Sequence, residues 1–126
     1  MSRHRSFREL LIWQSGMKLV KTVYRLSAQL PGDEKYGLVS QMRRASVSVP
    51  SNIAEGWARN TCGEFNQALG ISLGSLAELE TLVELCRDLE FISQTSFESM
   101  VSVVDPERRS ILSFKRTLAP SRRSTG

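Results

Sequence analysis

Apolar residues recur every three or four positions along nearly the whole chain, and this spacing constrains the fold more than any other feature. The longest run starts at Phe65 and continues through Leu69, Leu73, Leu76, Leu79, Leu82, Val83, Cys86 and Leu89. This period places side chains on one face of an α-helix, whereas a half-buried strand requires alternation. The stretch "ASVSVPS" alone alternates, and the sequence has no Asn-Gly or Asp-Gly hairpin signal. The sequence therefore predicts an all-α protein.

Proline, glycine and capping residues divide this pattern into four predicted helices, at about residues 7–30, 35–58, 62–89 and 96–118. The third has the clearest start, because Thr61 and Glu64 have the spacing of a capping box. Long helices joined by short links favour an antiparallel up-down-up-down four-helix bundle. We expect one domain over residues 1–118, followed by a disordered basic tail at 119–126.

Two prolines fall within predicted helices. In "VPSNIAEGWARN", a capping box from Asn52 to Glu55 would start a helix that ends by Asn60, too short to be worth nucleating. We therefore expect one helix that kinks at Pro50, at a cost of about 3 kcal/mol, with nearby serines bonding the freed carbonyl groups. In the fourth helix, Asp105 and Pro106 have the pattern of an N-cap and first helical residue, so this helix kinks or restarts there. Thr95 and Glu98 form another candidate capping box at its start.

The first helix has more apolar circumference than one small core requires. One row contains Leu10, Trp13, Met17, Val20 and Tyr24, and a second row contains Ile12, Leu19, Val23, Leu26 and Leu30. Together they span about 200°, whereas a helix packed on one core needs a stripe little more than 100° wide. We therefore expect a homo-oligomer, in which Ile12, Leu19, Val23 and Leu26 contact a neighbouring chain.

Charge is distributed unevenly, with basic ends around an acidic middle: residues 1–60 carry a net +6, residues 61–92 a net −5 and residues 93–126 a net +3. The candidate nucleic-acid-binding residues are Lys18, Lys21 and Arg25 on the first helix and Arg108, Arg109, Lys115 and Arg116 on the fourth, with Arg122 and Arg123 beyond it. Basic side chains bind nucleic acid by neutralising phosphates. The alternative is a solvated face, or pairing with Glu84, Asp88 and Glu90 of the third helix. The basic stripe has no aromatic residue, which argues against base recognition in single strands.

Enzymatic chemistry is not expected. The chain has a single histidine, His4, and its two cysteines, Cys62 and Cys86, are isolated, so neither a metal site nor a nucleophile–base pair is indicated. We expect no cofactor. No apolar run reaches the roughly 20 residues that span a bilayer, and the N-terminal apolar run is too short for a signal peptide. These features predict a cytoplasmic protein without a membrane partner.

Three motifs in order, "QMRRAS", "SNIAEG" and "GSLAELET", give the stretch from about residue 7 to 92 its resemblance to a known family. It resembles the four-helix bundle proteins encoded in intervening sequences of bacterial 23S ribosomal RNA. That family is similar to the accessory variability protein of diversity-generating retroelements, a homopentamer that binds nucleic acid and a reverse transcriptase. The resemblance implies a four-helix bundle, a pentamer and nucleic acid or a reverse transcriptase as partners.

The family motifs carry over to a set of polar residues and one glycine: Gln41, Arg43, Arg44, Asn52, Glu55, Gly56, Ser75, Glu78 and Glu80. We interpret them as a structural network, in which Arg43 or Arg44 pairs with Glu78 or Glu80 between the second and third helices. The chain departs from the family at Pro106. The resulting hypothesis is a non-enzymatic accessory or scaffold protein that binds RNA or DNA through phosphates. The alternative is a protein-interaction module with no nucleic-acid role.

Overall fold

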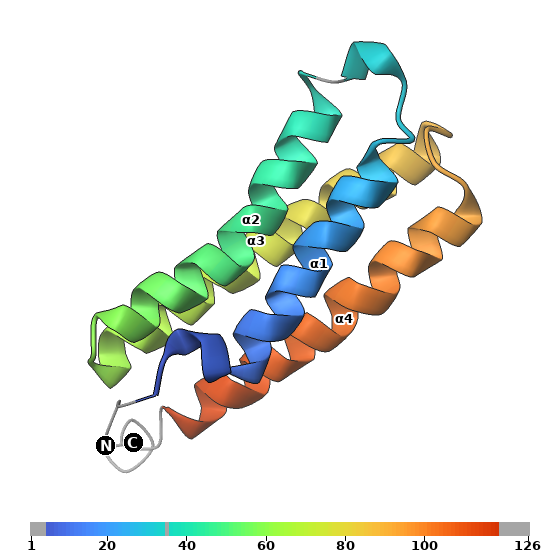
Figure 1. Ribbon diagram of the computed structural model, residues 1–126. Helices are drawn as coiled ribbons and strands as arrows, with labels where there is room; N and C mark the ends of the chain where they lie inside the picture. Colours follow the sequence, from blue (N-terminus) through green and yellow to red (C-terminus); the bar gives the residue numbers. More distant parts are fainter. Residues whose placement is uncertain (1–4, 35, 119–126) are drawn as a thin grey trace.

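The computed structural model describes residues 5–34 and 36–118, which form four long α-helices and no strand (Figure 1). The helices are α1 (Leu11–Ser27), α2 (Leu38–Ala58), α3 (Cys62–Asp88) and α4 (Gln94–Thr117). Two short 3-10 turns, η1 (Phe7–Glu9) and η2 (Gly32–Glu34), precede α1 and α2. The predicted all-α class is confirmed, and the predicted tail at 119–126 lies outside the described residues.

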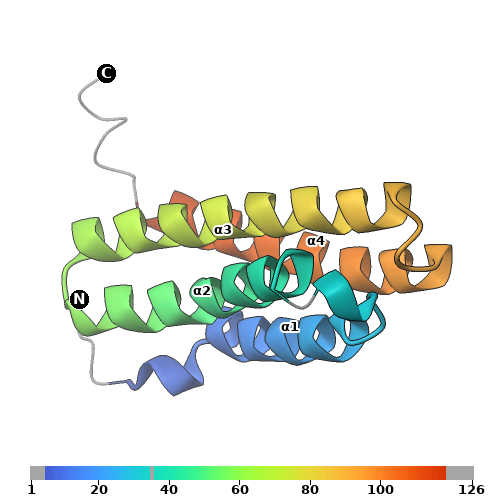
Figure 2. The ribbon, with the colours of Figure 1, turned by 90° about the horizontal axis from the view of Figure 1, so that it is seen from above.

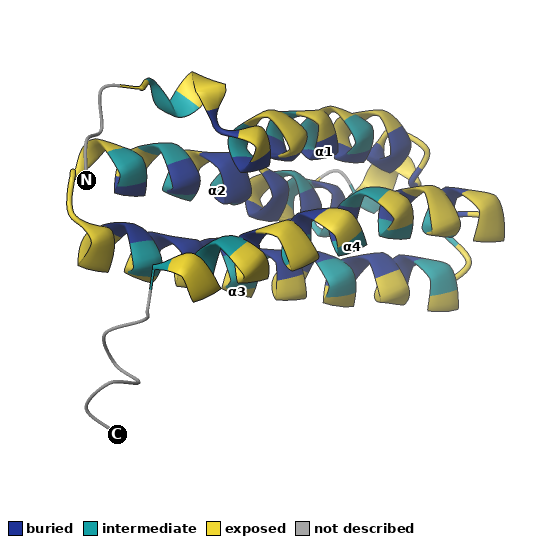
Figure 3. Cartoon of the chain, turned by 90° about the horizontal axis from the view of Figure 1, so that it is seen from below, coloured by how far each residue is buried: buried dark blue, intermediate teal, exposed yellow. Residues whose placement is uncertain are grey.

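The four helices surround one apolar core. α1 packs against α2 and α4, and α3 packs against the same two helices from the other side (Figures 1 and 2). On each helix, the buried residues lie along the side that faces the other helices (Figure 3). The largest fully buried apolar side chains are Phe65, Leu19, Met42, Ile53, Leu69, Leu76, Leu79, Met100 and Ile111. All of these side chains come from the four helices, so the core depends on all four segments.

The first helix is shorter than predicted. Its predicted start, at Phe7, is a single 3-10 turn that ends at Leu10, where the backbone is extended, with φ −75° and ψ 127°. The extended residue separates η1 from α1, although apolar spacing continues across it. The Phe7 ring then folds against Trp13, with 5.3 Å between ring centroids. Spacing alone therefore predicted a continuous helix where the chain has a bend.

The predicted oligomer contact at Ile12, Leu19, Val23 and Leu26 is wrong, because the chain's own core buries all four side chains. The other apolar row of the first helix, which contains Trp13, Met17, Val20 and Tyr24, is the less covered one. Trp13, Met17 and Val20 are half-buried and Tyr24 is 42% exposed. The apolar arc of the first helix therefore has two rows. The row that was predicted to contact another chain is buried in the core, and the other row is the one left partly exposed.

α2 continues through Pro50 as one helix, as predicted, and the alternative helix start at Asn52 is excluded. Pro50 has no N–H to donate to the carbonyl group of Ser46. Two nearby hydroxyl groups bond other carbonyls: Ser46 donates to Arg43 at 2.8 Å and Ser72 of α3 donates to Val49 at 2.9 Å. Tight packing on α1 and α3 stabilises the helix across the proline.

The capping box of α3 is confirmed: the Thr61 hydroxyl accepts from the Glu64 N–H at 3.1 Å and donates to the Glu64 carboxylate at 2.9 Å. The predicted cap of the fourth helix is wrong, since Ser93 and not Thr95 caps α4. α4 also runs unbroken through Pro106, contrary to the predicted cap at Asp105. Pro106 is exposed, so water can hydrate the carbonyl group that lacks its helical donor.

Among the described residues, no helix combines the length and apolar character needed to cross a membrane.

Candidate nucleic-acid interface

The exposed side of α1 carries three cations in a row. Lys18, Lys21 and Arg25 are separated by three and four positions, so they share one face of the helix, and all three are exposed. α1 contains no Asp or Glu. Within the described part of the chain, none of the three forms an ion pair. We call Lys18, Lys21 and Arg25 the α1 cation row.

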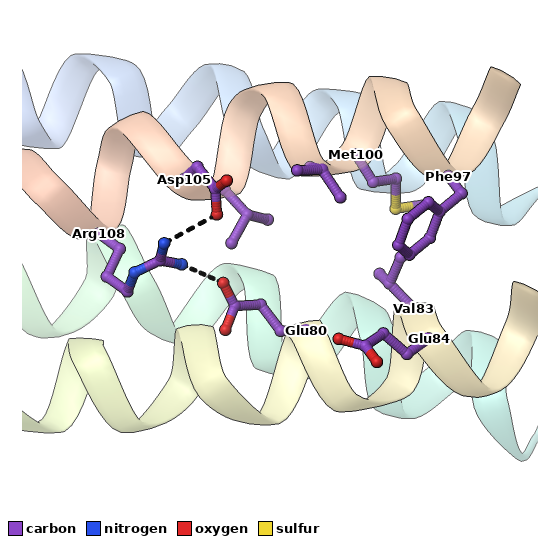
Figure 4. A pocket seen from close by; sticks show the side chains of 9 residues that line it. Glu80, Val83, Glu84, Phe97, Met100, Asp105 and Arg108 are labelled. Carbon is purple, nitrogen blue, oxygen red and sulfur yellow. Dashed lines mark hydrogen bonds and ion pairs between the residues drawn. The ribbon is translucent and has the colours of Figure 1, made fainter. Parts of the chain in front are cut away.

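The four predicted bases of α4 separate into two kinds. Arg109 and Arg116 are exposed and form no ion pair with a described residue. Arg108 instead bonds to Glu80 of α3, and it pairs with Asp105 at 2.9 Å (Figure 4). The Lys115 ammonium donates to both the backbone and the side-chain oxygen of Asn66, each at 3.0 Å. Arg108 and Lys115 are therefore occupied in joining α4 to α3, which corrects their assignment to a free basic surface.

A small cavity of about 330 Å³ lies beside Arg108, between α3 and α4 (Figure 4). Its apolar lining includes Val83, Phe97 and Met100, and its charged lining is mainly acidic: Glu80, Glu84 and Asp105 beside the single arginine. Because three carboxylates outnumber one guanidinium group, this cavity disfavours phosphate.

The predicted ion pairs from Arg43 or Arg44 to Glu78 or Glu80 are absent from the described residues, and the structure gives the reason. Arg43 lies on the side of α2 that faces α1, where it donates to the Ser27 hydroxyl at 3.0 Å and the Tyr24 carbonyl at 3.2 Å. Its guanidinium group also lies over the Tyr24 ring, 4.5 Å from the centroid. Glu80 faces α4. Arg44 and Glu78 are exposed.

Three of the other family-motif residues, Asn52, Gly56 and Ser75, lie at the crossing of α2 and α3. Asn52 donates to the backbone and hydroxyl oxygens of Ser48, at 2.8 and 2.9 Å, and Ser75 of α3 donates to the same hydroxyl at 2.8 Å. Gly56 permits the close approach, because a Cβ atom there would lie 2.3 Å from the Cβ of Ala68. The remaining two, Gln41 and Glu55, are exposed, and Glu55 pairs with Arg59 at 3.8 Å. These contacts are those of helix packing and not of a reactive centre.

Sequence reasoning missed Glu107, a carboxyl group only 2% exposed on α4. The Ser15 hydroxyl of α1 donates to one of its oxygens, and the other oxygen has no hydrogen-bond partner among the described residues. Burial raises the pKa of Glu107 to about 7, and the bond from Ser15 opposes part of that shift. The sequence contained a signal for this burial, because Glu107 continues a row of apolar residues at helical spacing on the fourth helix: Met100, Val104 and Ile111. A Cβ atom at Gly16 of α1 would lie 3.1 Å from the unbonded oxygen of Glu107 and 3.4 Å from the Cβ of Pro50, so Glu107 lies close to the contact of α1 with α2.

The described residues contain no group of three or more potential metal ligands. A second buried titratable group, the Cys86 thiol, has its pKa raised to about 11 by burial and, to a lesser extent, by the charge of Glu34. At neutral pH this thiol stays protonated, and it packs against the sulfur of Met42 at 3.6 Å. It fills the core.

Comparison with solved structures supports the fold. A crystal structure of a protein of unknown function from the S23 ribosomal protein family of Bacteroides thetaiotaomicron VPI-5482 superimposes with a TM-score of 0.77. The alignment covers 83% of this chain and 98% of that chain at 21% sequence identity, so it supports the fold alone. No curated protein matches the sequence. A family model described as 23S rRNA-intervening sequence protein matches residues 8–113, which is most of the chain. The chain therefore belongs to the family of 23S rRNA-intervening sequence proteins.

Proposed function

We propose that this protein is a non-enzymatic accessory or scaffold protein that binds RNA or DNA through backbone phosphates, in the cytoplasm. The observation that carries the proposal is the α1 cation row: three exposed cations on one helix face, on a helix without acids and without ion pairs to described residues. Phosphates are the partners that such a row favours, because each cation placed near the backbone releases a condensed counterion.

Arg109 extends the positive surface onto α4, which packs beside α1, and Arg116 is a further exposed cation of α4. The other cations of α4, Arg108 and Lys115, are held against α3 by Glu80 and Asn66. Arg109 lines a hollow together with residues of α1, which supports a positive surface that continues from α1 to α4.

The proposal includes the antiparallel up-down-up-down order, which the short links between consecutive helices support, and assembly into a homo-oligomer, a pentamer by family resemblance. The surface that supports assembly is the partly open row of α1, Trp13, Met17, Val20 and Tyr24, together with Val47 of α2. Val47 lies one helical turn beyond Arg43, whose guanidinium group covers Tyr24, so the two apolar patches adjoin. A ring of chains would multiply a modest phosphate affinity by avidity.

The test replaces Lys18, Lys21 and Arg25 together by Gln. We expect the intact protein to bind RNA or DNA at low salt and to lose affinity steeply between about 50 and 200 mM salt. The triple variant should bind more weakly, with a log–log salt slope lower by about 2–3. Binding is measured by fluorescence anisotropy, and oligomer size by light scattering.

Replacement of Arg44 by Gln is the matched control, since Arg44 is an exposed arginine on α2 outside the proposed surface. The absence of any RNA or DNA binding at low salt would refute the proposal. Dissociation of the oligomer in the triple variant would assign these cations to assembly and favour the protein-interaction module.

A further inference from the structure

An apolar groove of about 1020 Å³ lies at one end of the bundle. Figure 1 shows that α1 begins at this end and that α2 and α4 end there. Leu10, Leu11 and Ile12 line one side, and Trp57 and Phe114 contribute aromatic surface from α2 and α4. Leu11 is 79% exposed, the largest exposed fraction of any large apolar side chain on the four helices. An apolar hollow with so exposed a leucine at its edge is typical of a binding site.

The lining of this groove carries a net positive charge. Arg109 of α4 lines it and forms no ion pair with a described residue. Arg5 lines it as well and lies 3.9 Å from the one acidic residue of the lining, Glu9. Because the charges of Arg5 and Glu9 nearly cancel, Arg109 determines the net charge of the groove lining, which is positive. The groove therefore suits an occupant that combines apolar surface with negative charge.

The groove is continuous with the α1 cation row. A second hollow of about 300 Å³ shares Leu11, Ile12 and Ser110 with the groove and is also lined by Lys18. The two hollows therefore lie next to each other along the contact between α1 and α4. A strand that follows this contact from Arg109 would reach Lys18, and beyond it Lys21 and Arg25, on one continuous surface.

We propose that the groove receives an unpaired base of single-stranded RNA or DNA, while Arg109 and the α1 cation row hold the adjoining phosphates. This inference rests on the proposed function and names the class of nucleic acid that it takes. A base provides a flat apolar face, and its edges can bond the hydroxyl groups of Ser110 and Ser113, which line the groove. A duplex keeps its bases stacked inside and has no such group to insert.

This inference revises a conclusion drawn from the sequence. The basic stripe of α1 contains no aromatic residue, which argued against recognition of single strands. The fold brings Trp57 and Phe114 to the start of the same surface from helices far away in the sequence. The chain's own C-terminal segment is a poorer occupant, because residues 119–126 contain Arg122 and Arg123 and no large apolar side chain.

The test compares an oligouridine strand of about 12 nucleotides, a length within the range of single-strand sites, with an RNA duplex of equal length. Anisotropy is measured for the intact chain and for the variants Leu11→Ala and Arg109→Gln. We expect each variant to weaken binding of the single strand by roughly tenfold, and Leu11→Ala to leave binding of the duplex within about twofold. The matched controls are Leu89→Ala, an exposed leucine at the other end of the bundle, and Arg44→Gln.

Tryptophan fluorescence gives a second readout that phosphate contacts alone would not change. In a Trp13→Phe variant, Trp57 is the sole remaining tryptophan. The single strand should quench its emission, and the duplex should not. Equal affinity for strand and duplex with no effect of Leu11→Ala would overturn the inference and leave the proposed function standing. Failure of both nucleic acids to bind at low salt would remove the proposed function as well.

Discussion

At the scale of single residues, the buried carboxyl group of Glu107 makes stability depend on pH. Its pKa is raised from 4.5 to about 7 in the folded chain. Between these values the folded state holds a proton that the unfolded state has lost. The free energy of unfolding should therefore be highest below about pH 4.5, decrease as the pH rises toward 7, and change no further from this group above that value. The full decrease is on the order of 3 kcal/mol.

We expect Glu107→Gln to remove this decrease, because an amide keeps the shape of the protonated acid without titrating. Urea unfolding at pH 5 and pH 8 measures it, with the variant more stable than the parent at pH 8. The exposed Glu98, which lies on the same helix, provides the matched control as Glu98→Gln. A pH dependence that survives in Glu107→Gln and not in Glu98→Gln would contradict the assignment.

Two glycines should respond oppositely to the same change. At Gly56 a new Cβ atom would lie 2.3 Å from the Cβ of Ala68, so α2 and α3 must move apart. We expect Gly56→Ala to destabilise the chain by about 2 kcal/mol. At Gly74, in the middle of α3, a Cβ atom would meet nothing within 4 Å, and Gly74→Ala should stabilise by about 0.5–1 kcal/mol through helix propensity. Equal effects in thermal or urea unfolding would show that the α2–α3 crossing is not tight.

The sequence contained part of this residue-level information. Helical spacing with Met100, Val104 and Ile111 places Glu107 inward, but a charged residue is ordinarily assigned to the surface. The partners of Arg43 and Arg108 were harder to predict from the sequence. Which helix an arginine faces depends on the rotation of its helix about its own axis, and apolar spacing fixes that rotation only to within the width of the apolar stripe.

At the scale of helices, substitutions of two neighbouring arginines of α4 should have different effects, one on the stability of the fold and the other on nucleic-acid binding. Arg108 bridges Glu80 and Asp105, all about one-third exposed, so Arg108→Gln should lower stability by about 1 kcal/mol by weakening the α3–α4 contact. Arg109→Gln should leave stability unchanged and weaken nucleic-acid binding. Urea unfolding and anisotropy on the two variants check both halves. Loss of binding in Arg108→Gln alone would place the nucleic-acid surface on the α3 side instead.

Most of the helix positions could be predicted, and the errors have identifiable causes. The middle of each helix follows from apolar spacing, and the start of α3 follows from its capping box. Leu10 is apolar and in register but extended, so spacing could not reveal the bend before α1. Pro106 is a genuine helix-breaking residue, but α4 continues through it. The proline is exposed, so the missing backbone hydrogen bond costs the helix little stability.

At the scale of the whole molecule, neither the groove nor the proposed assembly surface could be predicted from the sequence, since each combines residues from different helices. Leu11, Trp57 and Phe114 are brought together only by the bundle. The same holds for the proposed contact surface between chains: the sequence indicates a wide apolar arc on α1, but packing on α2 and α4 decides which row of that arc is covered.

Val47 offers the sharpest test of assembly. It is 39% exposed and adjoins the partly open row of α1, so a charge there would be buried in an oligomer but hydrated in a monomer. We expect Val47→Lys to reduce the particle size measured by light scattering to that of one chain, with helical circular dichroism unchanged. Ile71→Lys, on a more exposed apolar residue of α3, should keep the size of the parent protein. If Ile71→Lys dissociates the particle and Val47→Lys does not, the chains meet through α3. In that case the partly open row of α1 stays exposed to water. The α1 cation row of each chain would then bind nucleic acid without the avidity that assembly through this row of α1 would provide.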